Sequence, residues 1–302
     1  MPPPDASLSA ALKRLLTRRE AAIVPGAPDA LTARVIEDLG FEAVYVTGAG
    51  LTNARLGLPD LGFITLSQLA DAVAAIRHVV SVPMLVDADT GFGNALNVAH
   101  AVAVLERAGA NGIQIEDQVF PKRCGHFAGK QVIPAEEMAE KVRAAADARK
   151  DADFQIVART DAREALGLDA ALERAAAYVE AGADATFVEA PLGVEELGCI
   201  AGALDAPQVA NMVAGGRTPL VGREALREMG FGAVLYANAA LQAALAGMTT
   251  VLRALRDDGT LERVADRLTP FDERQRLVRK QDYDTLAERY AGPQQPAAKP
   301  RR

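Results

Sequence analysis

The sequence is poor in the residues that build disulfide frameworks and zinc sites. Its 302 residues include two cysteines, Cys124 and Cys199, and three histidines. No CxxC or HxxxH spacing occurs, so the ligand patterns of a zinc site are missing. A metal bound by this chain would therefore be a hard cation held by carboxylates. The lack of a disulfide framework also predicts a cytoplasmic protein, because thiols stay reduced there.

Long apolar runs and an excess of positive charge are missing as well. No run approaches the roughly 20 apolar residues that span a bilayer, so we expect no membrane segment. The opening MPPPDASLSA has no charged stretch followed by an apolar core, which argues against a secretion signal. The formal net charge is −7, whereas nucleic-acid binding requires a basic surface. Half of the residues are hydrophobic, as in an ordinary globular protein.

One pattern does recur along the chain. In four segments a helix-like stretch ends, a glycine follows, and a short apolar run begins three residues later. The segments are EDLGFEAVYVTG (37–48), ERAGANGIQIED (106–117), VEAGADATFVEA (179–190) and REMGFGAVLYAN (227–238). Each glycine stands where the end of a helix requires a positive φ. The runs that follow are continuously apolar, which is typical of strands buried on both faces.

Four further apolar runs complete a set of eight predicted strands. They are residues 21–27, 82–89, 154–161 and 207–213. The gaps can each hold a helix, as at 66–78, 95–108, 134–149 and 169–181. Eight alternating strands and helices predict an α/β fold of the (β/α)₈ TIM-barrel type. A doubly wound open sheet is the alternative, and the absence of a GxGxxG turn after the first strand disfavours it.

The C-terminal region continues beyond the eighth unit. From about residue 258 to 290 the chain is charged and predicted to be helical, either covering the barrel or crossing to a neighbouring subunit. Residues 291–302 are Pro-rich and predicted to be a disordered tail. We expect residues 1–290 to form a single barrel domain that includes these extra C-terminal helices.

Charged residues follow most of the predicted strands directly. In a barrel the carboxyl ends of all strands share one rim, where the active site lies. VDADTGFGN (86–94) places Asp87 and Asp89 two residues apart, so both side chains should leave a strand on the same side. Two such carboxylates repel unless a cation lies between them, and Glu116 ends the next strand. The pattern predicts a Mg²⁺ site, with a simple strand-ending turn as the alternative.

IEDQVFPKRCGH (115–126) leads from Glu116 into a loop that carries Cys124. The positively charged residues around this cysteine are Lys122, Arg123 and His126. Positive charge lowers the pKa of a thiol and makes it a usable acid or nucleophile. The alternative is an ordinary loop thiol. Because glycines flank the segment, we interpret it as a moving lid that brings a proton donor over the metal site.

Two further strand ends suggest anion binding. Arg159 either forms a structural salt bridge with Asp161 or Glu189, or clamps a carboxylate or phosphate. The glycine-rich stretch 47–50 offers backbone N–H groups and a hydroxyl to an anion, although alone it is a weak indication. By contrast, Cys199 lies in a predicted helix and is expected to be a core thiol.

Together these segments resemble the isocitrate lyase/phosphoenolpyruvate mutase superfamily. The motifs appear in family order over residues ~20–255 and are TGAGLTNARLGLPDLG, VDADTGFGN, IEDQVFPKRCGH, ARTDA, FVEAP and NMVAGGRTPL. The KRCGH motif is the most specific of them. The resemblance implies a (β/α)₈ barrel with Mg²⁺, for which Mn²⁺ could substitute. It also implies a homotetramer in which C-terminal helices swap between subunits.

The resemblance assigns roles to residues of this sequence. Asp87 and Asp89 would hold Mg²⁺, partly through water, with Glu116 in support. Residues expected to shape the substrate site are Thr47, Gly48, Ala49, Asp60, Arg159, Glu189 and Asn211. Tyr45 would lie near the substrate hydroxyl. Cys124 would be the general acid, on a lid shaped by Lys122, Gly125 and His126.

The activity implied is carbon–carbon cleavage of a small 2-hydroxy dicarboxylate, giving an α-keto acid such as pyruvate and a carboxylate. At Ala214, Gln242 and Phe271 the family's polar substrate contacts are missing, which disfavours a tricarboxylate. The segments NMVAGGRTPL and DATFVEAP resemble the branch that cleaves 2-alkylmalates, dimethylmalate or oxaloacetate. Alternatives are an oxaloacetate hydrolase or decarboxylase and a phosphonomutase. More remote are a methylisocitrate lyase and a non-catalytic barrel that binds a dicarboxylate.

Overall fold

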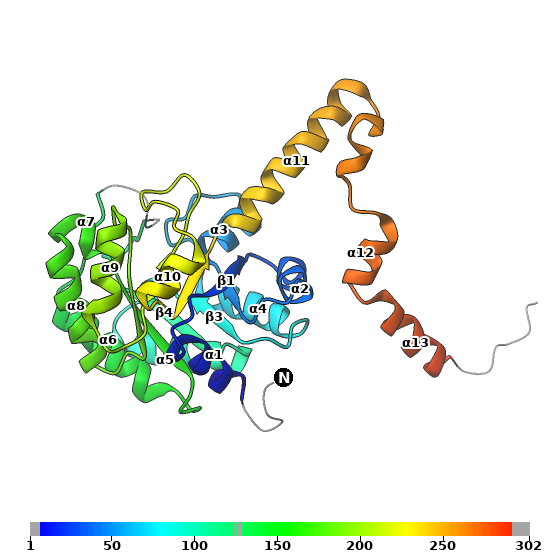
Figure 1. The fold of residues 1–302 in the computed structure, drawn as a ribbon. Coiled ribbons are helices and arrows are strands. Elements are labelled where there is room, and N and C mark those ends of the chain that lie inside the picture. Colours follow the sequence, from blue (N-terminus) through cyan, green and yellow to red (C-terminus); the bar gives the residue numbers. More distant parts are fainter. Residues whose placement is uncertain (1–6, 124, 126–128, 292–302) are drawn as a thin grey trace, which may run out of the picture. The chain divides into compact units, whose positions relative to one another are not determined.

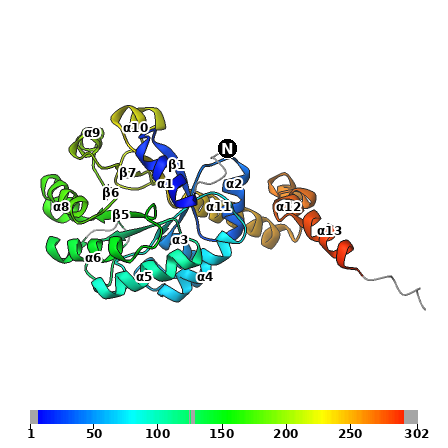
Figure 2. The same cartoon turned by 90° about the horizontal axis from the view of Figure 1, so that it is seen from below.

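In the computed structural model, which describes residues 7–123, 125 and 129–291, eight parallel strands are surrounded by helices (Figures 1 and 2). The strands are β1 Ala22–Ala27, β2 Val44–Val46, β3 Met84–Asp87, β4 Gly112–Glu116, β5 Gln155–Thr160, β6 Ala185–Val188, β7 Val209–Asn211 and β8 Ala233–Tyr236. Each predicted strand is confirmed.

The helices also follow the predicted alternation. In the barrel they are α1 Leu8–Thr17, α2 Ala30–Asp38, α3 Gly48–Leu56, α4 Leu66–Arg77, α5 Ala95–Ala108, α6 Ala135–Ala148, α7 Ala162–Leu166, α8 Leu168–Glu180, α9 Val194–Ala203 and α10 Arg223–Met229. The start of α5 shows how the sequence sets a boundary. Asn94 accepts hydrogen bonds from the backbone N–H groups of Leu96 and Asn97, and the helix ends at Gly109 with φ +105°.

The strands form a nearly closed barrel. Their order around the sheet is β6-β5-β4-β3-β2-β1-β8-β7, and neighbouring strands in this order are parallel. A single bridge, Thr186 to Gln208, joins β6 to the residue before β7. The (β/α)₈ TIM-type fold is therefore confirmed, and all strand ends that carry candidate residues lie on one rim.

Helix α1 closes the opposite end of the barrel. Its side chains Leu12, Leu15 and Leu16 belong to one cluster with inward-facing residues of the strands, such as Val157 and Leu235. A Cβ atom on Gly232, at the start of β8, would lie 2.4 Å from the carbonyl oxygen of Leu16. The helix and the strand thus approach so closely that only glycine fits.

The described residues divide into two units, one ending at Ala246 and one beginning at Gly247. Helix α11, Ala239–Asp258, runs across this division and buries only Ala254. The second unit continues through the 3₁₀ helix Glu262–Arg267, α12 Phe271–Leu277 and α13 Lys280–Tyr290. The predicted helical character of this region is confirmed.

One prediction about the thiols is wrong. Cys199 lies in α9 as expected, but its side chain is exposed and does not belong to the core. The buried face of α9 is formed by Leu197, Ile200 and Ala201 instead.

No helix within the described ranges is both long and apolar enough to cross a membrane.

Candidate active site

A small cavity of about 30 Å³ opens at the carboxyl ends of the strands. Predicted residues that line it are Tyr45, Thr47, Ala49, Asp60, Asp87, Lys122, Gly125, Arg159, Glu189 and Asn211. The cavity has room for about two waters. A dicarboxylate is larger, so the cavity must widen to admit one.

Lys122 forms the centre of one half of the site. Its ammonium nitrogen lies 2.5 Å from Asp60 Oδ1 and 2.8 Å from Asp89 Oδ1, and the side chain is 4% exposed. Burial alone would lower the pKa of Lys122, but the surrounding carboxylates outweigh it and raise that pKa well above its usual range. Lys122 is therefore a permanent cation among these carboxylates.

Asp87 and Asp89 approach the same region by a route different from the predicted one. β3 ends at Asp87, and Asp89 lies beyond it with a left-handed φ of +48°. The alternation of a strand therefore does not place the two side chains together, and that part of the prediction is wrong. Instead the chain turns, and the backbone N–H of Asp89 donates to Asp87 Oδ1 at 3.2 Å.

Gln114, which the motif analysis missed, links two predicted residues. It is fully buried on β4, accepts a hydrogen bond from the Tyr45 hydroxyl at 3.1 Å and donates to Asp87 Oδ1 at 3.4 Å. Burial, together with the charge of Asp87, holds the pKa of Tyr45 well above its usual range, so its hydroxyl stays protonated. Gln114 stands two residues before Glu116 on the same strand, and this spacing was the available indication.

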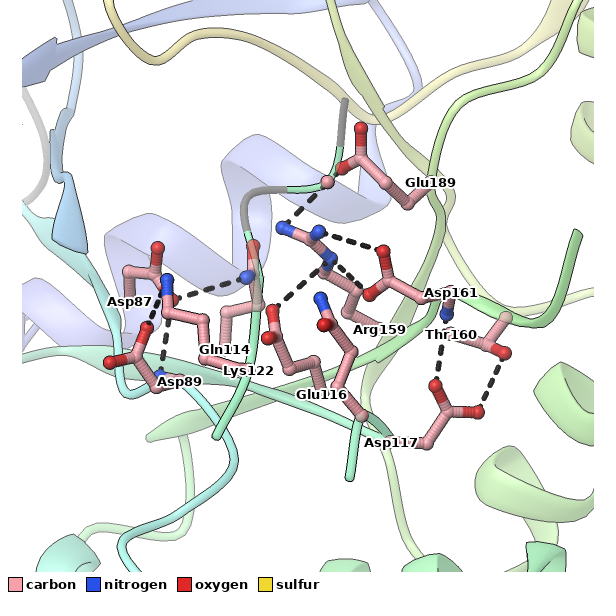
Figure 3. A network of polar contacts seen from close by, with 12 residues as sticks. Asp87, Asp89, Gln114, Glu116, Asp117, Lys122, Arg159, Thr160, Asp161 and Glu189 are labelled. Carbon is pink, nitrogen blue, oxygen red and sulfur yellow. Dashed lines mark hydrogen bonds and ion pairs between the residues drawn. The ribbon is translucent and has the colours of Figure 1, made fainter. Parts of the chain in front are cut away.

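Arg159 forms the centre of the other half of the site (Figure 3). Its guanidinium donates to both oxygens of Asp161, at 2.9 and 3.0 Å, and this pair is the salt bridge considered above. It also lies 3.3 Å from Glu116 and 3.4 Å from Glu189. Burial raises the pKa of Glu116 well above its usual range, against the opposing effect of Arg159.

The N-terminus of α3 faces the cavity. Thr47 caps this helix by accepting a hydrogen bond from the backbone N–H of Gly50 at 3.2 Å. The backbone N–H of Gly48 points to Asp87 Oδ2 at 3.3 Å. N–H groups at a helix N-terminus favour an anion, and here Gly48 already meets the Asp87 carboxylate; the substrate-binding role of residues 47–49 stays a prediction.

The loop between β4 and α6 is pinned at its base. The backbone N–H of Val119 donates to Gln131, that of Ile133 donates to Asp117, and each distance is 2.8 Å. The Gln118 side chain both donates to and accepts from the backbone of Arg123, at 2.9 Å each. Cys124 and His126, the predicted proton donor and its neighbour, lie outside the described residues.

Asp117 is a structural residue beside the site. Its buried carboxylate accepts hydrogen bonds from Thr160 at 2.7 Å, the backbone of Asp161 at 2.9 Å, Tyr178 at 2.8 Å and Arg174 at 3.1 Å. These bonds tie the end of β4 to the end of β5 and to α8, and Figure 3 shows those from Thr160 and Asp161. Glu116 and Arg159 are thereby fixed next to each other.

Negative charge exceeds positive charge around the cavity. The carboxylates are Asp60, Asp87, Asp89, Glu116, Asp161 and Glu189, whereas the cations are Lys122, Arg123, Lys130 and Arg159. Burial raises the pKa of Asp89 to about 6 despite Lys122, and Asp87 and Asp60 add to the rise. Glu116 Oε1 is buried without a hydrogen-bond partner among the described residues. A hard cation would relieve both conditions.

Lys122 and Arg159 each pair with a different group of these carboxylates. Lys122 forms ion pairs with Asp60 and Asp89. Arg159 forms ion pairs with Glu116, Asp161 and Glu189. Accordingly, within the part of the chain that the structure describes, no three His, Cys, Asp or Glu side chains form a ready metal-binding group. The donor set fits a cation that is held partly through water, which is how Mg²⁺ is usually bound.

The rest of the cavity lining is formed by Arg123, Phe187, Val213, Ala237 and Asn238. None of these was predicted as a site residue, although Asn238 lies two residues after β8 and the strand-end rule could have found it. Ala214, Gln242 and Phe271, the positions expected to set substrate choice, are not among the lining residues. Gln242 donates to the backbone of Ala214 at 3.4 Å, and Phe271 is 67% exposed in the second unit.

Comparison with known proteins identifies the family. Residues 12–256 match the family described as phosphoenolpyruvate phosphomutase. The chain belongs to this family. It is 45% identical over 265 residues to a 2,3-dimethylmalate lyase of Eubacterium barkeri, covering 88% of this chain and 92% of that protein. It is 46% identical over 273 residues to a 2-methylisocitrate lyase of Aeropyrum pernix, covering 90% of this chain and 88% of that protein.

Solved structures of the phosphoenolpyruvate mutase/isocitrate lyase superfamily are also similar. An oxaloacetate acetylhydrolase in complex with 3,3-difluorooxalacetate gives a TM-score of 0.89 at 34% identity, covering 95% of this chain and 98% of that one. A phosphonopyruvate hydrolase in complex with oxalate and Mg²⁺ gives a TM-score of 0.85 at 30% identity, covering 94% of this chain and 99% of that one. The predicted superfamily is thus confirmed, and the chain is an enzyme of this lyase and mutase superfamily.

Proposed function

We propose that the chain is a Mg²⁺-dependent carbon–carbon lyase for a small 2-hydroxy dicarboxylate of the 2-alkylmalate or dimethylmalate type. Its products are an α-keto acid such as pyruvate and a second carboxylate. Two observations support this activity, namely the family to which the chain belongs and the residues that line the cavity. The similar proteins include lyases, a hydrolase and a mutase, so the choice among them rests on the residues of this chain.

The observation that carries the proposal is the division of one cavity into polar and apolar parts. The N-terminus of α3, at Thr47, lies on one side and the Arg159 guanidinium also lines the cavity, giving two places for carboxylates. Phe187, Val213 and Ala237 provide an apolar wall. Such a cavity suits a dicarboxylate with alkyl substituents, whereas a third carboxylate would lack a partner on that wall.

Asp87, Asp89 and Glu116 would hold the cation. Bound Mg²⁺, or Mn²⁺ in its place, would stabilise negative charge that develops on the oxygen atoms of the keto acid end. Asp60 and Lys122 lie next to these carboxylates, at 2.5 Å from each other, and a bound divalent cation would share the pairing of Asp60 and Asp89 with Lys122.

The remaining groups of this chain orient the substrate and move a proton. The C2–C3 bond breaks, the hydroxyl at C2 gives its proton to a carboxylate of the cavity and becomes the carbonyl, and the electron pair passes to C3 and onto its carboxylate. Cys124 gives its proton to C3, so no oxidant or reductant is needed. The protonated Tyr45 hydroxyl, oriented by Gln114, donates a hydrogen bond near the substrate hydroxyl and does not act as the base.

A substrate screen tests the proposal. The protein is incubated with Mg²⁺ and malate, 2-alkylmalates or 2,3-dimethylmalate, and pyruvate is measured with lactate dehydrogenase, with other keto acids measured as hydrazones. Release of a keto acid that stops when EDTA is added is the expected result. Absence of any keto acid from all of them, in the presence of Mg²⁺, would sink the lyase proposal.

The same screen separates the alternatives. Oxalate from oxaloacetate would indicate a hydrolase, and a phosphorus NMR signal lost from phosphonopyruvate would indicate phosphonate chemistry. Cleavage of methylisocitrate at the best rate would contradict the argument from the apolar wall. Binding of a dicarboxylate without turnover of any compound would indicate a non-catalytic barrel.

A further inference from the structure

Lys130 is a buried cation that the proposed chemistry does not use. Its side chain is 0% exposed, although it follows a polar loop in the sequence. The ammonium donates to the backbone carbonyl of Gly125 at 2.5 Å and to Asp161 Oδ1 at 2.8 Å, and Glu164 Oε2 lies at 3.5 Å. A lysine loses much solvation when it is buried, so three acceptors around one ammonium indicate a fixed position.

The acceptor Gly125 is itself a wall of the cavity. A Cβ atom on Gly125 would lie 2.4 Å from Arg159 Nη2 and 2.6 Å from Glu189 Cδ. The backbone of the loop therefore rests directly on the Arg159 and Glu189 side chains. Any shift of the Gly125 carbonyl moves the surface that a ligand meets beside Arg159.

The acceptor Asp161 is shared with Arg159. One carboxylate thus receives the guanidinium at 2.9 and 3.0 Å and the Lys130 ammonium at 2.8 Å. Burial alone would raise the pKa of Asp161, but Arg159 and Lys130 outweigh it and lower that pKa to about 2. Without Lys130 the whole negative charge of Asp161 would fall on Arg159 and compete with a ligand carboxylate for it.

We propose that Lys130 is a positioning residue that anchors the Gly125 carbonyl to the rim of the barrel and, through Asp161, leaves Arg159 available to a substrate carboxylate. The anchoring of Gly125 stands on the contacts alone. The effect on a substrate carboxylate rests on the proposed function.

The test compares Lys130→Met with Lys130→Arg, which keeps the charge and the donors. Hydrogen exchange followed by mass spectrometry reports on peptides covering residues 117–133. We expect exchange there to become about tenfold faster or more in Lys130→Met, as for loss of a charged buried hydrogen bond, and to be largely restored in Lys130→Arg. With the substrate from the screen, KM should rise about tenfold, more than kcat falls.

Arg149→Met is the matched control. Arg149 also bridges a backbone carbonyl and an aspartate, Phe154 at 2.8 Å and Asp184 at 2.6 Å, but it does so before the starts of β5 and β6, at the opposite end of the barrel. Its replacement should leave exchange at 117–133 and KM unchanged. A general loss of stability would change both variants alike and would contradict a local role of Lys130.

Other outcomes judge the two parts separately. If Lys130→Met does not fold, Lys130→Gln takes its place and keeps a polar group in the same space. Unchanged exchange at 117–133 in a folded variant overturns the anchoring. Faster exchange with an unchanged KM overturns the effect on Arg159. If no substrate is found, the lyase proposal fails, and exchange alone decides the anchoring.

Discussion

At the scale of single residues, the site depends on buried polar groups that touch several partners each. Gln114 connects Tyr45 to Asp87, Arg159 connects Glu116 to Glu189, and Lys122 connects Asp60 to Asp89. A buried polar group that loses its partner incurs a desolvation cost, so each link constrains both of its ends. Replacement of a connecting residue should therefore disturb function more than its own contacts suggest.

Gln114→Leu tests this argument. The change removes the acceptor of the Tyr45 hydroxyl and the donor to Asp87, and we expect a loss of about 10–100-fold in activity or metal affinity, as is typical for residues behind metal ligands. Turnover and Mn²⁺ binding by electron paramagnetic resonance are the measurements. Gln155→Leu is the control, because Gln155 is equally buried but lies at the amino end of β5. Equal effects of both changes would refute the specific role of Gln114.

Cys124→Ala tests the proton donor. Turnover should fall by about 10²–10⁴-fold, because a positioned general acid contributes that much, while binding of oxalate by calorimetry should survive. Cys199→Ala is a useful control, since the exposed Cys199 on α9 is remote from the chemistry and should retain normal turnover. Normal turnover in Cys124→Ala would show that another group protonates the carbon.

At the scale of elements, the barrel is stabilised from both ends. α1 closes the amino end with leucines packed on the inner strands, and α7 and α9 are joined beside the site by an ion pair between Arg163 and Glu196 at 2.5 Å. The first contact depends on burial of apolar surface. The second depends on charge and therefore on pH, so the two can be distinguished experimentally.

Leu16→Ala should destabilise the fold by about 2–5 kcal/mol, the usual cost of truncating a core leucine. Leu16 is 1% exposed, whereas Leu39, at the end of α2, is 70% exposed. Leu39→Ala should therefore change the free energy of unfolding little. Urea unfolding followed by circular dichroism gives both values, and similar losses in the two variants would mean that α1 does not seal the barrel.

The ion pair between Arg163 and Glu196 makes a pH-dependent contribution to the stability of the fold. Arg163 lowers the pKa of Glu196, against a rise from partial burial, while Glu164 acts on Arg163 from the same helix. The pKa of Glu196 in the folded protein lies below its value in the unfolded chain, which is about 4.3. The ion pair therefore stabilises the fold fully above about pH 4.3, and this stabilisation is lost as the pH falls through the folded-state pKa of Glu196. The Tm of Glu196→Gln should lie below that of the original protein at pH 7, and the difference should shrink toward pH 3. A difference independent of pH would assign the effect to packing.

At the scale of the whole molecule, α11 carries an unusual apolar stripe. Leu245, Met248, Leu252 and Leu255 recur at helical spacing and are 51%, 51%, 61% and 43% exposed in the single chain. Exposed apolar stripes of this kind mark interfaces. An interface is what the predicted homotetramer with swapped C-terminal helices requires of this region, and that assembly stays a prediction, as does the single domain of residues 1–290.

Light scattering after size exclusion tests the assembly. We expect the protein to elute as a tetramer and Leu252→Asp to shift it to smaller species, because a charge cannot be buried unpaired in an interface. Arg253→Asp is the control, since it changes a charge on the adjacent, already polar position. A monomeric original protein, or a tetramer unaffected by Leu252→Asp, would contradict a role for the stripe.

The sequence by itself determined the alternation of strands and helices, since local patterns suffice for that. Short apolar runs after glycine predict β2, β4, β6 and β8, and the strand-end rule brings Asp87, Glu116 and Arg159 to one rim. These conclusions need only the periodicity of the chain and the common direction of parallel strands.

Only the tertiary structure decided which partners those residues have. Asp89 comes close to Asp87 because the chain turns there with a positive φ. Lys130 is buried because its ammonium contacts Gly125 and Asp161. Cys199 is exposed because α9 buries a different face. Each depends on residues distant in the sequence or on one backbone angle. The physical reason is that burial and electrostatic pairing belong to the packed molecule, whereas a sequence pattern specifies only the local element.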